Sequence, residues 1–341
     1  MSANEAAAPT LEIVICTYNR AADLDRCLGA LAAQRVRPVG WRVTVVDNNC
    51  TDATSEVVEA YIASGNLMRL QRIMEPRQGL TPARLRGVRE TLADWVAFID
   101  DDCIADPDWV AEALTFATAY PESGAFGGRV VPDWGEAPLR HAARNAWLYA
   151  AQDHGDETCL VKSLVGAGIV LNRRALAATG WTQAPLIADR VGRGTVSGGD
   201  VELILRLAAA GRPLFYVPGM RIAHRIPKMR QRMRNALALA RGLGAGSELI
   251  NLMADPDPQG WADRSGARLA AKTWRHIAGL RHVVAIRYPL RDWLIFAAFL
   301  LGQHEGRRAL VTDPVTRARI GGRGALLSKA LQSTRQVKNA R

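Results

Sequence analysis

The sequence predicts an α/β protein in which a mainly parallel sheet carries helices on both faces, with a helical extension after it. Strand-like and helix-like segments alternate along residues 11–100. The strand-like segments are apolar almost throughout, rather than at every second position, which indicates strands buried on both faces. From about Met229 onward, helical patterns rich in Arg and Ala take over.

The alternating part opens with four strand-like segments, LEIVICTY (11–18), RVTVVDN (42–48), LMRLQRIM (67–74) and WVAFID (95–100). Between them apolar residues recur at helical spacing, which predicts helices over 20–34, 51–63 and 80–93. Strand–helix–strand units of this kind join parallel strands, so these segments are expected to form one sheet.

The pattern changes after residue 105. A helix is expected over 107–120, with Asp106 as its N-cap and Pro107 at its first position. Further elements are expected in the order strand 125–132, strand 164–172, helix 198–211 and strand 214–219. We therefore expect an α/β domain over 9–226, a helical region over 227–312 and a basic, partly disordered tail over 313–341.

Charge is distributed unevenly between the two ends of the chain. Residues 221–341 hold 23 of the 44 Lys and Arg but only 7 of the 33 Asp and Glu, which leaves 21 basic against 26 acidic residues for 1–220. A strongly basic second part favours an anionic partner, such as a membrane surface, a phosphate-bearing substrate or nucleic acid.

The five cysteines are scattered without a C-x-x-C pair, which is typical of reduced thiols in a reducing compartment. The start MSANEAAAPTLE lacks a basic segment followed by an apolar run, so no signal peptide is expected. The longest apolar run, WLIFAAFLLG (293–302), is about half of what spans a bilayer. We expect a cytoplasmic protein that can lie peripherally on the inner face of the membrane.

Polar residues follow three of the expected strands where each ends. They are Thr17, Tyr18 and Asn19 after the first, Asp47, Asn48 and Asn49 after the second, and Asp100, Asp101 and Asp102 at the fourth. Ligands of open α/β sheets bind at the carboxyl ends of the strands, so these residues are the first candidates for a site.

The three consecutive acids are the most informative of these residues. In an extended segment Asp100 and Asp102 share a face and Asp101 points the other way. Two carboxylates on one face suit a hard cation such as Mg²⁺ or Mn²⁺, which takes further ligands from substrate phosphates. The alternative is a solvated turn in which one acid caps the next helix, a role that Asp106 fills better.

The remaining candidates each have a structural alternative. Asp47 and Asn48 suit a base or a ribose, or else form a turn before a helix. The loop and helix bearing Arg77 and Arg84 suit anionic oxygens, or else form an ordinary basic surface.

Asp200 follows two glycines at a helix start, so it is either a general base on a mobile loop or a helix cap. His224 is a ligand or a structural histidine. No G-x-S-x-G, G-x-x-x-x-G-K-[ST], H-E-x-x-H or G-x-G-x-x-G motif is present, which argues against several hydrolase, NTPase and dinucleotide-binding classes.

Together these segments resemble the family 2 glycosyltransferases, which have the GT-A fold. The resemblance covers about residues 11–226 and lies in the order of its motifs. They are IVICTYNR (13–20), VTVVDNNCTDAT (43–54), RQGLTPARLRG (77–87), FIDDDC (98–103), GAGIVLNRRAL (166–176), GGDVELILRL (198–207) and PGMRIAH (218–224).

The resemblance implies an inverting transfer of a sugar from a nucleotide-diphosphate donor to a glycan, lipid-linked or small-molecule hydroxyl. Asp200 would be the base, and Asp102, Asp100 and His224 would hold Mg²⁺ or Mn²⁺. The expected nucleotide-sugar-binding residues are Thr17, Tyr18, Asn19, Asp47, Asn48, Arg77, Arg84, Asp100 and Asp101. Asp47, Asn48 and Thr17 would lie at the nucleoside and Arg84 near the diphosphate.

Some residues depart from the family pattern. Leu85 stands where an Asn is usual and Gly199 where a Glu is usual, which bears on the identity of the donor. The segment KMRQRMRN (228–235) only approximates the signature of processive enzymes, so single transfer is expected.

Two other classes of function stay open. A sugar-1-phosphate nucleotidyltransferase also uses Mg²⁺, but it would need a Gly-rich basic loop after the first strand. A membrane- or nucleic-acid-binding protein would use the basic second part, although we expect no nucleic acid partner. Trp274, Trp293 and Phe296 would lie on an anionic membrane, or else belong to a packed helical subdomain with a solvated basic face.

Overall fold

The computed structural model describes residues 10–36, 39–67, 69–187, 189, 197–280 and 289–321. The chain divides into two compact units that interleave along the sequence. The sheet unit takes Met1–Asp133, Ala150–Ala184 and Arg212–Arg225, and the helical unit takes Trp134–Tyr149, Pro185–Gly211 and Ile226–Arg341. Of the predicted basic tail, residues 322–341 lie outside the described residues.

The main sheet of the sheet unit has eight strands in the order β3-β2-β1-β4-β9-β6-β10-β8. Their bounds are β1 Leu11–Thr17, β2 Trp41–Asp47, β3 Leu70–Met74, β4 Trp95–Phe98, β6 Ala125–Gly127, β8 Cys159–Leu160, β9 Ile169–Asn172 and β10 Leu214–Tyr216. The first four are mutually parallel, as are β6 and β10, whereas β9 and β8 run antiparallel to their neighbours. The predicted mixed, mainly parallel sheet is confirmed.

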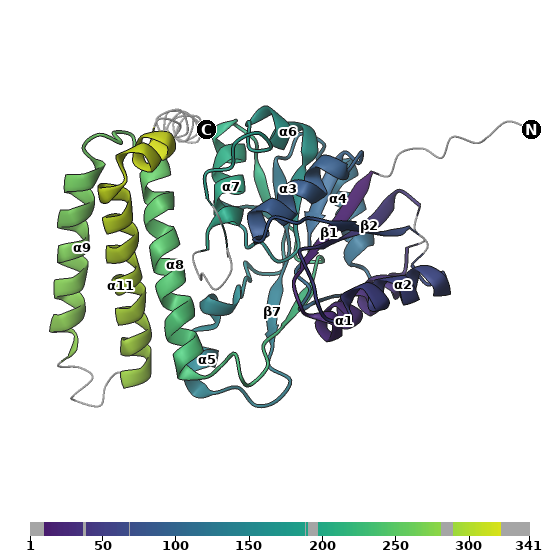
Figure 1. Cartoon of the computed structure of the whole chain (residues 1–341), viewed down its shortest axis with the longest axis horizontal. Coiled ribbons are helices and arrows are strands. Elements are labelled where there is room, and N and C mark those ends of the chain that lie inside the picture. Colours follow the sequence, from purple (N-terminus) through teal and green to yellow (C-terminus); the bar gives the residue numbers. More distant parts are fainter. Residues whose placement is uncertain are drawn as a thin grey trace, which may run out of the picture. The chain divides into compact units, whose positions relative to one another are not determined.

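Helices cover both faces of this sheet, as the apolar strands predicted (Figure 1). They are α1 Ala21–Ala32, α2 Thr54–Ser64, α3 Leu80–Glu90, α4 Trp109–Ala119 and α6 Arg173–Ala178. Ile13 and Ile15 share one apolar cluster with side chains of α1, α2 and α4. Val14, between them, meets α3 at Gly87, where an added Cβ would lie 2.4 Å from the Val14 side chain. Both faces of β1 are therefore buried, which explains why its sequence is apolar almost throughout.

A second, three-stranded sheet in the order β5-β11-β7 was not predicted. It consists of β5 Cys103–Ala105, β7 Val130–Asp133 and β11 Ile222–Arg225. The predicted strand 125–132 was wrong as a single element, because the chain passes from β6 to β7 at Gly128. A Cβ at Gly128 would lie 1.8 Å from the Met220 carbonyl oxygen, so only glycine fits this crossing.

Other predicted elements also differ in their bounds. The strand predicted over 164–172 is confined to β9, Ile169–Asn172. Helix α4 begins at Trp109, and its N-cap residue is Asp108, without a side-chain cap. The prediction that Asp106 caps this helix was wrong: its carboxylate lies 3.4 Å from Arg221 Nε, and its backbone carbonyl accepts from Trp109 N.

The helical unit contains α5 Arg140–Arg144, the short 3₁₀ helix η1 Ala146–Tyr149, α7 Gly199–Ala209, α8 Met233–Met253, α9 Trp261–Ala278 and α11 Leu290–Thr312. Helices α8, α11 and α9 lie side by side (Figure 1). Helices α8 and α11 approach at Gly244 and Gly302, where an added Cβ would lie within about 2 Å of a carbonyl oxygen of the other helix. No helix in the described part of the chain is both long and apolar enough to cross a bilayer.

Candidate active site

The ends of three parallel strands place the predicted residues of the sheet unit together. In the β1–β2 register Thr17 pairs with Asp47, and in the β1–β4 register Val14 pairs with Phe98. Ile99 then donates its backbone N–H to the Val14 carbonyl at 3.2 Å, so the acids that follow lie near the end of β1. The main sheet thus brings the polar residues after β1, β2 and β4 to one edge, where ligands of open α/β sheets bind.

The acidic turn, Asp100–Asp102, contains the candidate metal ligands. Among the described residues, Asp100, Asp102 and Cys103 form the group whose ligand atoms lie within 4.8 Å of one another. Burial raises the pKa of the Cys103 thiol well above its ordinary value, and Asp100 and Asp102 raise it further. A protonated thiol is a poor ligand, so the donor set fits a hard cation held by carboxylates rather than a thiolate-bound metal.

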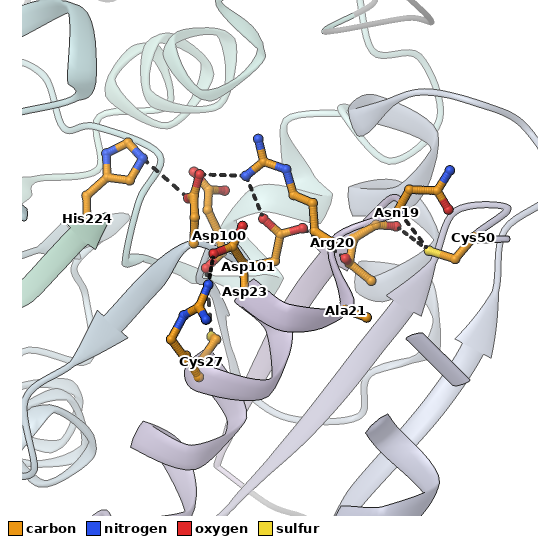
Figure 2. Close-up of polar contacts among 12 residues, drawn as sticks. Asn19, Arg20, Ala21, Asp23, Cys27, Cys50, Asp100, Asp101 and His224 are labelled. Atoms are coloured by element: carbon orange, nitrogen blue, oxygen red, sulfur yellow. Dashed lines mark hydrogen bonds and ion pairs between the residues drawn. The ribbon is translucent and has the colours of Figure 1, made fainter. Parts of the chain in front are cut away.

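Asp102 is buried. It contacts two basic side chains, Arg20 and His224, both labelled in Figure 2. Its Oδ2 lies 2.6 Å from a guanidinium nitrogen of Arg20, and its Oδ1 lies 3.3 Å from His224 Nε2. His224 comes from β11, where antiparallel pairing with Cys103 of β5 sets it beside the turn. The unpredicted small sheet is therefore what brings the late histidine to the acids.

Asp101 is buried, and it contacts Thr17 and Arg20. Thr17 donates its hydroxyl to Asp101 Oδ2 at 2.8 Å, and Arg20 lies 3.3 Å from Oδ1. Burial raises the pKa of Asp101 to about 7, against the lowering effect of Arg20. Asp101 is thus tied to the end of β1 through Thr17, and it shares the guanidinium of Arg20 with Asp102.

Sequence reasoning missed Arg20 as a site residue. It is the residue before α1, in the TYNR segment, and it contacts two of the three acids. Its position directly after the polar end of β1 was the available signal, but only the tertiary structure shows that its side chain turns towards the acids.

The two arginines that were predicted from the sequence, Arg77 and Arg84, have different surroundings. Arg84 is buried on α3, with its guanidinium 5.1 Å from the Phe98 ring centroid and 3.8 Å from Asp100 Oδ1. Arg77 is mostly exposed and pairs with Glu75 of its own loop at 2.8 Å. Arg84 therefore lies at the acidic turn, whereas the guanidinium of Arg77 is engaged within its loop.

The residues after β2 organise loops. Asp47 accepts from Cys50 N at 2.8 Å and lies 3.0 Å from Arg72. Asn48 is buried, donates to the carbonyls of Glu75 and Arg77 at 2.8 Å each and accepts from Gly79 N at 2.8 Å. The amide of Asn48 thus fixes the chain that leads into α3.

The residues after β1 are linked to the loop after β2. Asn19 adopts a positive φ of 53° and accepts from Thr51 N at 2.7 Å. Tyr18, the preceding residue, is 49% exposed and therefore accessible to a ligand.

Asp200 lies in the helical unit, in the first turn of α7. The N-cap residue of this helix is Gly198, at φ 145°, and the carboxylate of Asp189 accepts from Gly199 N at 3.1 Å, so the alternative that Asp200 is the cap was wrong. One Asp200 oxygen accepts from Val201 N at 2.9 Å. Its role as the base stays a prediction.

Comparison with known proteins identifies relatives of this chain. Residues 12–180 match the family model "Glycosyl transferase family 2". The chain is 38% identical over 108 residues to a validoxylamine A glucosyltransferase of Streptomyces hygroscopicus subsp. limoneus, a match that covers 31% of this chain and 23% of that protein. The chain thus spans about a quarter of the length of this relative.

Two further matches extend beyond the matched domain. A glucosyl-dolichyl phosphate glucuronosyltransferase of Haloferax volcanii is 24% identical over 222 residues, 63% of this chain and 69% of that protein. The structure of a mannosyltransferase from Pyrobaculum calidifontis, in complex with GDP-Man and Mn²⁺, is similar with a TM-score of 0.56 at 19% identity, covering 95% of this chain and 86% of that one. This likeness shows a shared GT-A-type fold, and with the family match it confirms the resemblance: the chain contains a domain of glycosyl transferase family 2.

Proposed function

We propose that the protein transfers a sugar from a nucleoside-diphosphate donor to an acceptor hydroxyl, with inversion at the anomeric carbon. The observation that carries this proposal is the acidic turn at the ends of β1, β2 and β4, with Asp100 and Asp102 beside Arg84 and His224. The family match supports it, as does the similar mannosyltransferase, whose structure is a complex with GDP-Man and Mn²⁺.

The acidic turn would bind the donor through its diphosphate. Asp100 and Asp102 would hold Mg²⁺ or Mn²⁺, with His224 as a further ligand. The bound ion would neutralise charge on the leaving diphosphate. Arg84, whose guanidinium faces Asp100 from α3, would add a second positive group near the diphosphate.

The remaining predicted residues would bind the nucleoside and activate the acceptor. Thr17, Tyr18 and Asp47 lie at the adjacent strand ends, where a base and a ribose would fit. Asn48 and Asn19 would act indirectly, because their side chains hold the surrounding loops. Asp200 would remove the proton from the acceptor hydroxyl as the bond to the sugar forms.

The donor is tested by incubating the purified protein with a panel of nucleotide sugars and Mn²⁺ or Mg²⁺. Release of nucleoside diphosphate is expected with at least one donor, and it should require the metal. Release of pyrophosphate from a nucleoside triphosphate and a sugar 1-phosphate would instead indicate a nucleotidyltransferase. Absence of metal-dependent binding or turnover of any donor would refute the proposal.

We propose that the acceptor is lipid-linked and that the protein works at the inner face of an anionic membrane. One end of the helical unit, where α9 ends and α8 and α11 begin, combines exposed apolar side chains with basic ones. The exposed apolar residues are Met229, Trp274, Ile277, Leu280, Leu290, Leu294 and Phe296. The exposed arginines are Arg232, Arg234, Arg275 and Arg291.

This end carries little negative charge to oppose an anionic surface. The nearest acid on α11, Asp292, is buried and pairs with Arg144 at 2.5 Å. Tryptophans with neighbouring arginines are typical of surfaces that lie in the headgroup region of a membrane. The name of the Haloferax relative, which specifies a dolichyl phosphate substrate, supports the same class of acceptor.

Sedimentation with lipid vesicles tests the membrane proposal. Vesicles containing phosphatidylglycerol should bind the protein, and those of phosphatidylcholine alone should bind it weakly. Trp274→Ser should weaken binding about tenfold, since a largely exposed indole would lose its burial in lipid. Val315→Ser is the matched control, because Val315 is equally exposed but lies beyond the other end of α11. Equal binding to both kinds of vesicle would argue against this surface.

A further inference from the structure

Arg20 is held firmly at its backbone and contacts the acidic turn with its side chain. On one side, Asn19 accepts a hydrogen bond from Thr51 N at 2.7 Å. On the other, Ala21 N donates to Asp52 Oδ2 at 2.9 Å. Both neighbours of Arg20 are thus fixed to the loop between β2 and α2. The guanidinium points towards Asp101 (Figure 2), and it also contacts Asp102.

The acids that Arg20 contacts need a positive partner. Asp101 and Asp102 are adjacent in sequence and each is 6% exposed. Two buried carboxylates repel one another, and each loses hydration in the charged form. Arg20 lies 3.3 Å from one and 2.6 Å from the other, and so compensates both charges at once.

The same contact conflicts with a metal ion on Asp102. Arg20 lies against Asp102 Oδ2, and Oδ1 faces His224 at 3.3 Å. A divalent cation on this carboxylate would be repelled by a guanidinium that shares it. The Arg20 side chain is 39% exposed, so it has a route into solvent, whereas Asp102 is fixed in the turn.

We propose that Arg20 is an internal counter-ion of the metal-free acidic turn, and that a divalent cation must displace it from Asp102 in order to bind. This inference rests on the proposed function, because it takes Asp100 and Asp102 as the ligands of the ion. Arg20 is a positioning residue: it keeps the acids buried and ordered without the ion. Its release couples binding of the ion to movement of the Arg20 side chain into solvent.

The test compares Arg20→Gln with Arg26→Gln in the full chain. Arg26 lies on α1, close to Arg20 in sequence, and likewise pairs with an acid, Asp23. Among the described residues it forms no ion pair with Asp100, Asp101 or Asp102. Binding of Mn²⁺ alone is measured from the electron paramagnetic resonance signal of the free ion, and stability from the thermal midpoint. Arg20→Gln should bind Mn²⁺ about tenfold more tightly, a typical coupling between two binding events, and unfold at a lower temperature without the ion. Arg26→Gln should leave both values unchanged.

A second measurement uses the wild-type protein and so does not depend on the folding of a variant. Phenylglyoxal modifies accessible guanidinium groups, and the modified peptides are quantified by mass spectrometry. Mn²⁺ should speed modification of Arg20 and leave that of Arg26 unchanged. A rate for Arg20 that stays constant or falls would overturn the proposal.

The outcomes separate this inference from the function on which it rests. Mn²⁺ binding by the wild-type protein, with equal or weaker affinity in Arg20→Gln, would overturn the counter-ion role alone. Failure of both proteins to bind Mn²⁺ would overturn the metal site as well.

Discussion

Each unit contains a cluster of polar side chains around buried acid, and the two clusters differ in how the negative charge is compensated. In the helical unit, Glu248 of α8 is fully buried and pairs with Arg268 of α9 at 2.8 Å. Its other oxygen accepts from Asn251 at 2.8 Å and from Gln303 of α11 at 3.1 Å. One carboxylate therefore joins three helices through partners that are all internal to the unit.

The acidic turn of the sheet unit instead places three carboxylates in succession, Asp100, Asp101 and Asp102. Arg20 serves both Asp101 and Asp102, and burial raises the pKa of Asp101 to about 7. A single buried acid with its own internal partners indicates a structural role, whereas adjacent acids that share one guanidinium, one of them with a raised pKa, indicate a site for a cation. The difference lies in the partners and not in the degree of burial.

The largest expected effect is on activity, at the acidic turn. Asp102→Asn should lower sugar transfer about 10³-fold, because it removes a charged metal ligand from the site of developing charge. The rate is measured with the donor found in the nucleotide-sugar screen. Asp106→Asn is the control, since Asp106 is a nearby acid in a surface pair with Arg221, and it should retain wild-type activity. An active Asp102→Asn enzyme would remove the contrast between the two clusters.

A smaller loss of activity is expected from the proposed base. Asp200→Asn should lower transfer by about 10²-fold or more, as expected for loss of a general base. Binding of the donor, measured by calorimetry, should be retained, because Asp200 would act on the acceptor. A variant that transfers sugar at the wild-type rate would exclude Asp200 from the mechanism.

At Glu248 of the helical unit the expected effect is on stability rather than on activity. Glu248→Ala should lower the free energy of unfolding by about 2–3 kcal/mol, somewhat less than for a fully buried pair because Arg268 is partly exposed. Glu305→Ala is the control: Glu305 pairs with Arg241 on the surface and should contribute about 0.5 kcal/mol. Denaturant unfolding measures both. Equal losses of unfolding free energy in the two variants would show that the burial of Glu248 does not increase its contribution to stability.

The smallest effect is expected at a surface acid near the acidic turn. Asp52 accepts from Ala21 N, at the start of α1, and from Thr54 N, at the start of α2. Its removal in Asp52→Ala should cost about 1 kcal/mol, as for loss of a helix cap. The control is Asp25→Ala on the exposed surface of α1, which should change stability little.

The stabilisation by Asp52 should also depend on pH. Partial burial raises the pKa of its carboxyl, but hydrogen bonds from Thr54 and Ala21 outweigh burial and hold it below the ordinary value of 3.8. The stabilisation is then present above pH 3.8 and is lost as the pH falls through the folded-state pKa. The wild type and Asp52→Ala should therefore converge in thermal midpoint in acid. A constant difference down to low pH would contradict this explanation.

The local parts of the site were predictable from sequence, and the long-range parts were not. Apolar runs ending in Thr17, Asp47 and Asp100 predicted strands whose ends meet, and the register confirms that they do. The pairing of β5 with β11 depends on contacts between distant segments, so the small sheet was not visible in advance, and only the family resemblance grouped His224 with Asp102.

Two predictions were wrong because contacts between distant residues outweighed local sequence signals. Asp106 and Pro107 carry a helix-start pattern, yet the Asp106 carboxylate pairs with Arg221 instead. The apolar run 125–132 looks like one strand, but the close approach of Gly128 to the Met220 carbonyl divides it between two sheets. Capping and strand signals report local preference, which packing against distant residues can outweigh.

The antiparallel register between β5 and β11 limits which changes of chain length the protein can accept. His224 stands opposite Cys103, and Arg225 N donates to the Asp102 carbonyl at 2.9 Å. Because side chains alternate along a strand, a shift of one residue would turn His224 to the opposite face of the small sheet. The insertion of one residue between Gly219 and Ile222 would therefore remove the histidine from the acids while leaving every residue of the motif in the sequence. The spacing of this segment carries as much information about the site as the identity of its residues.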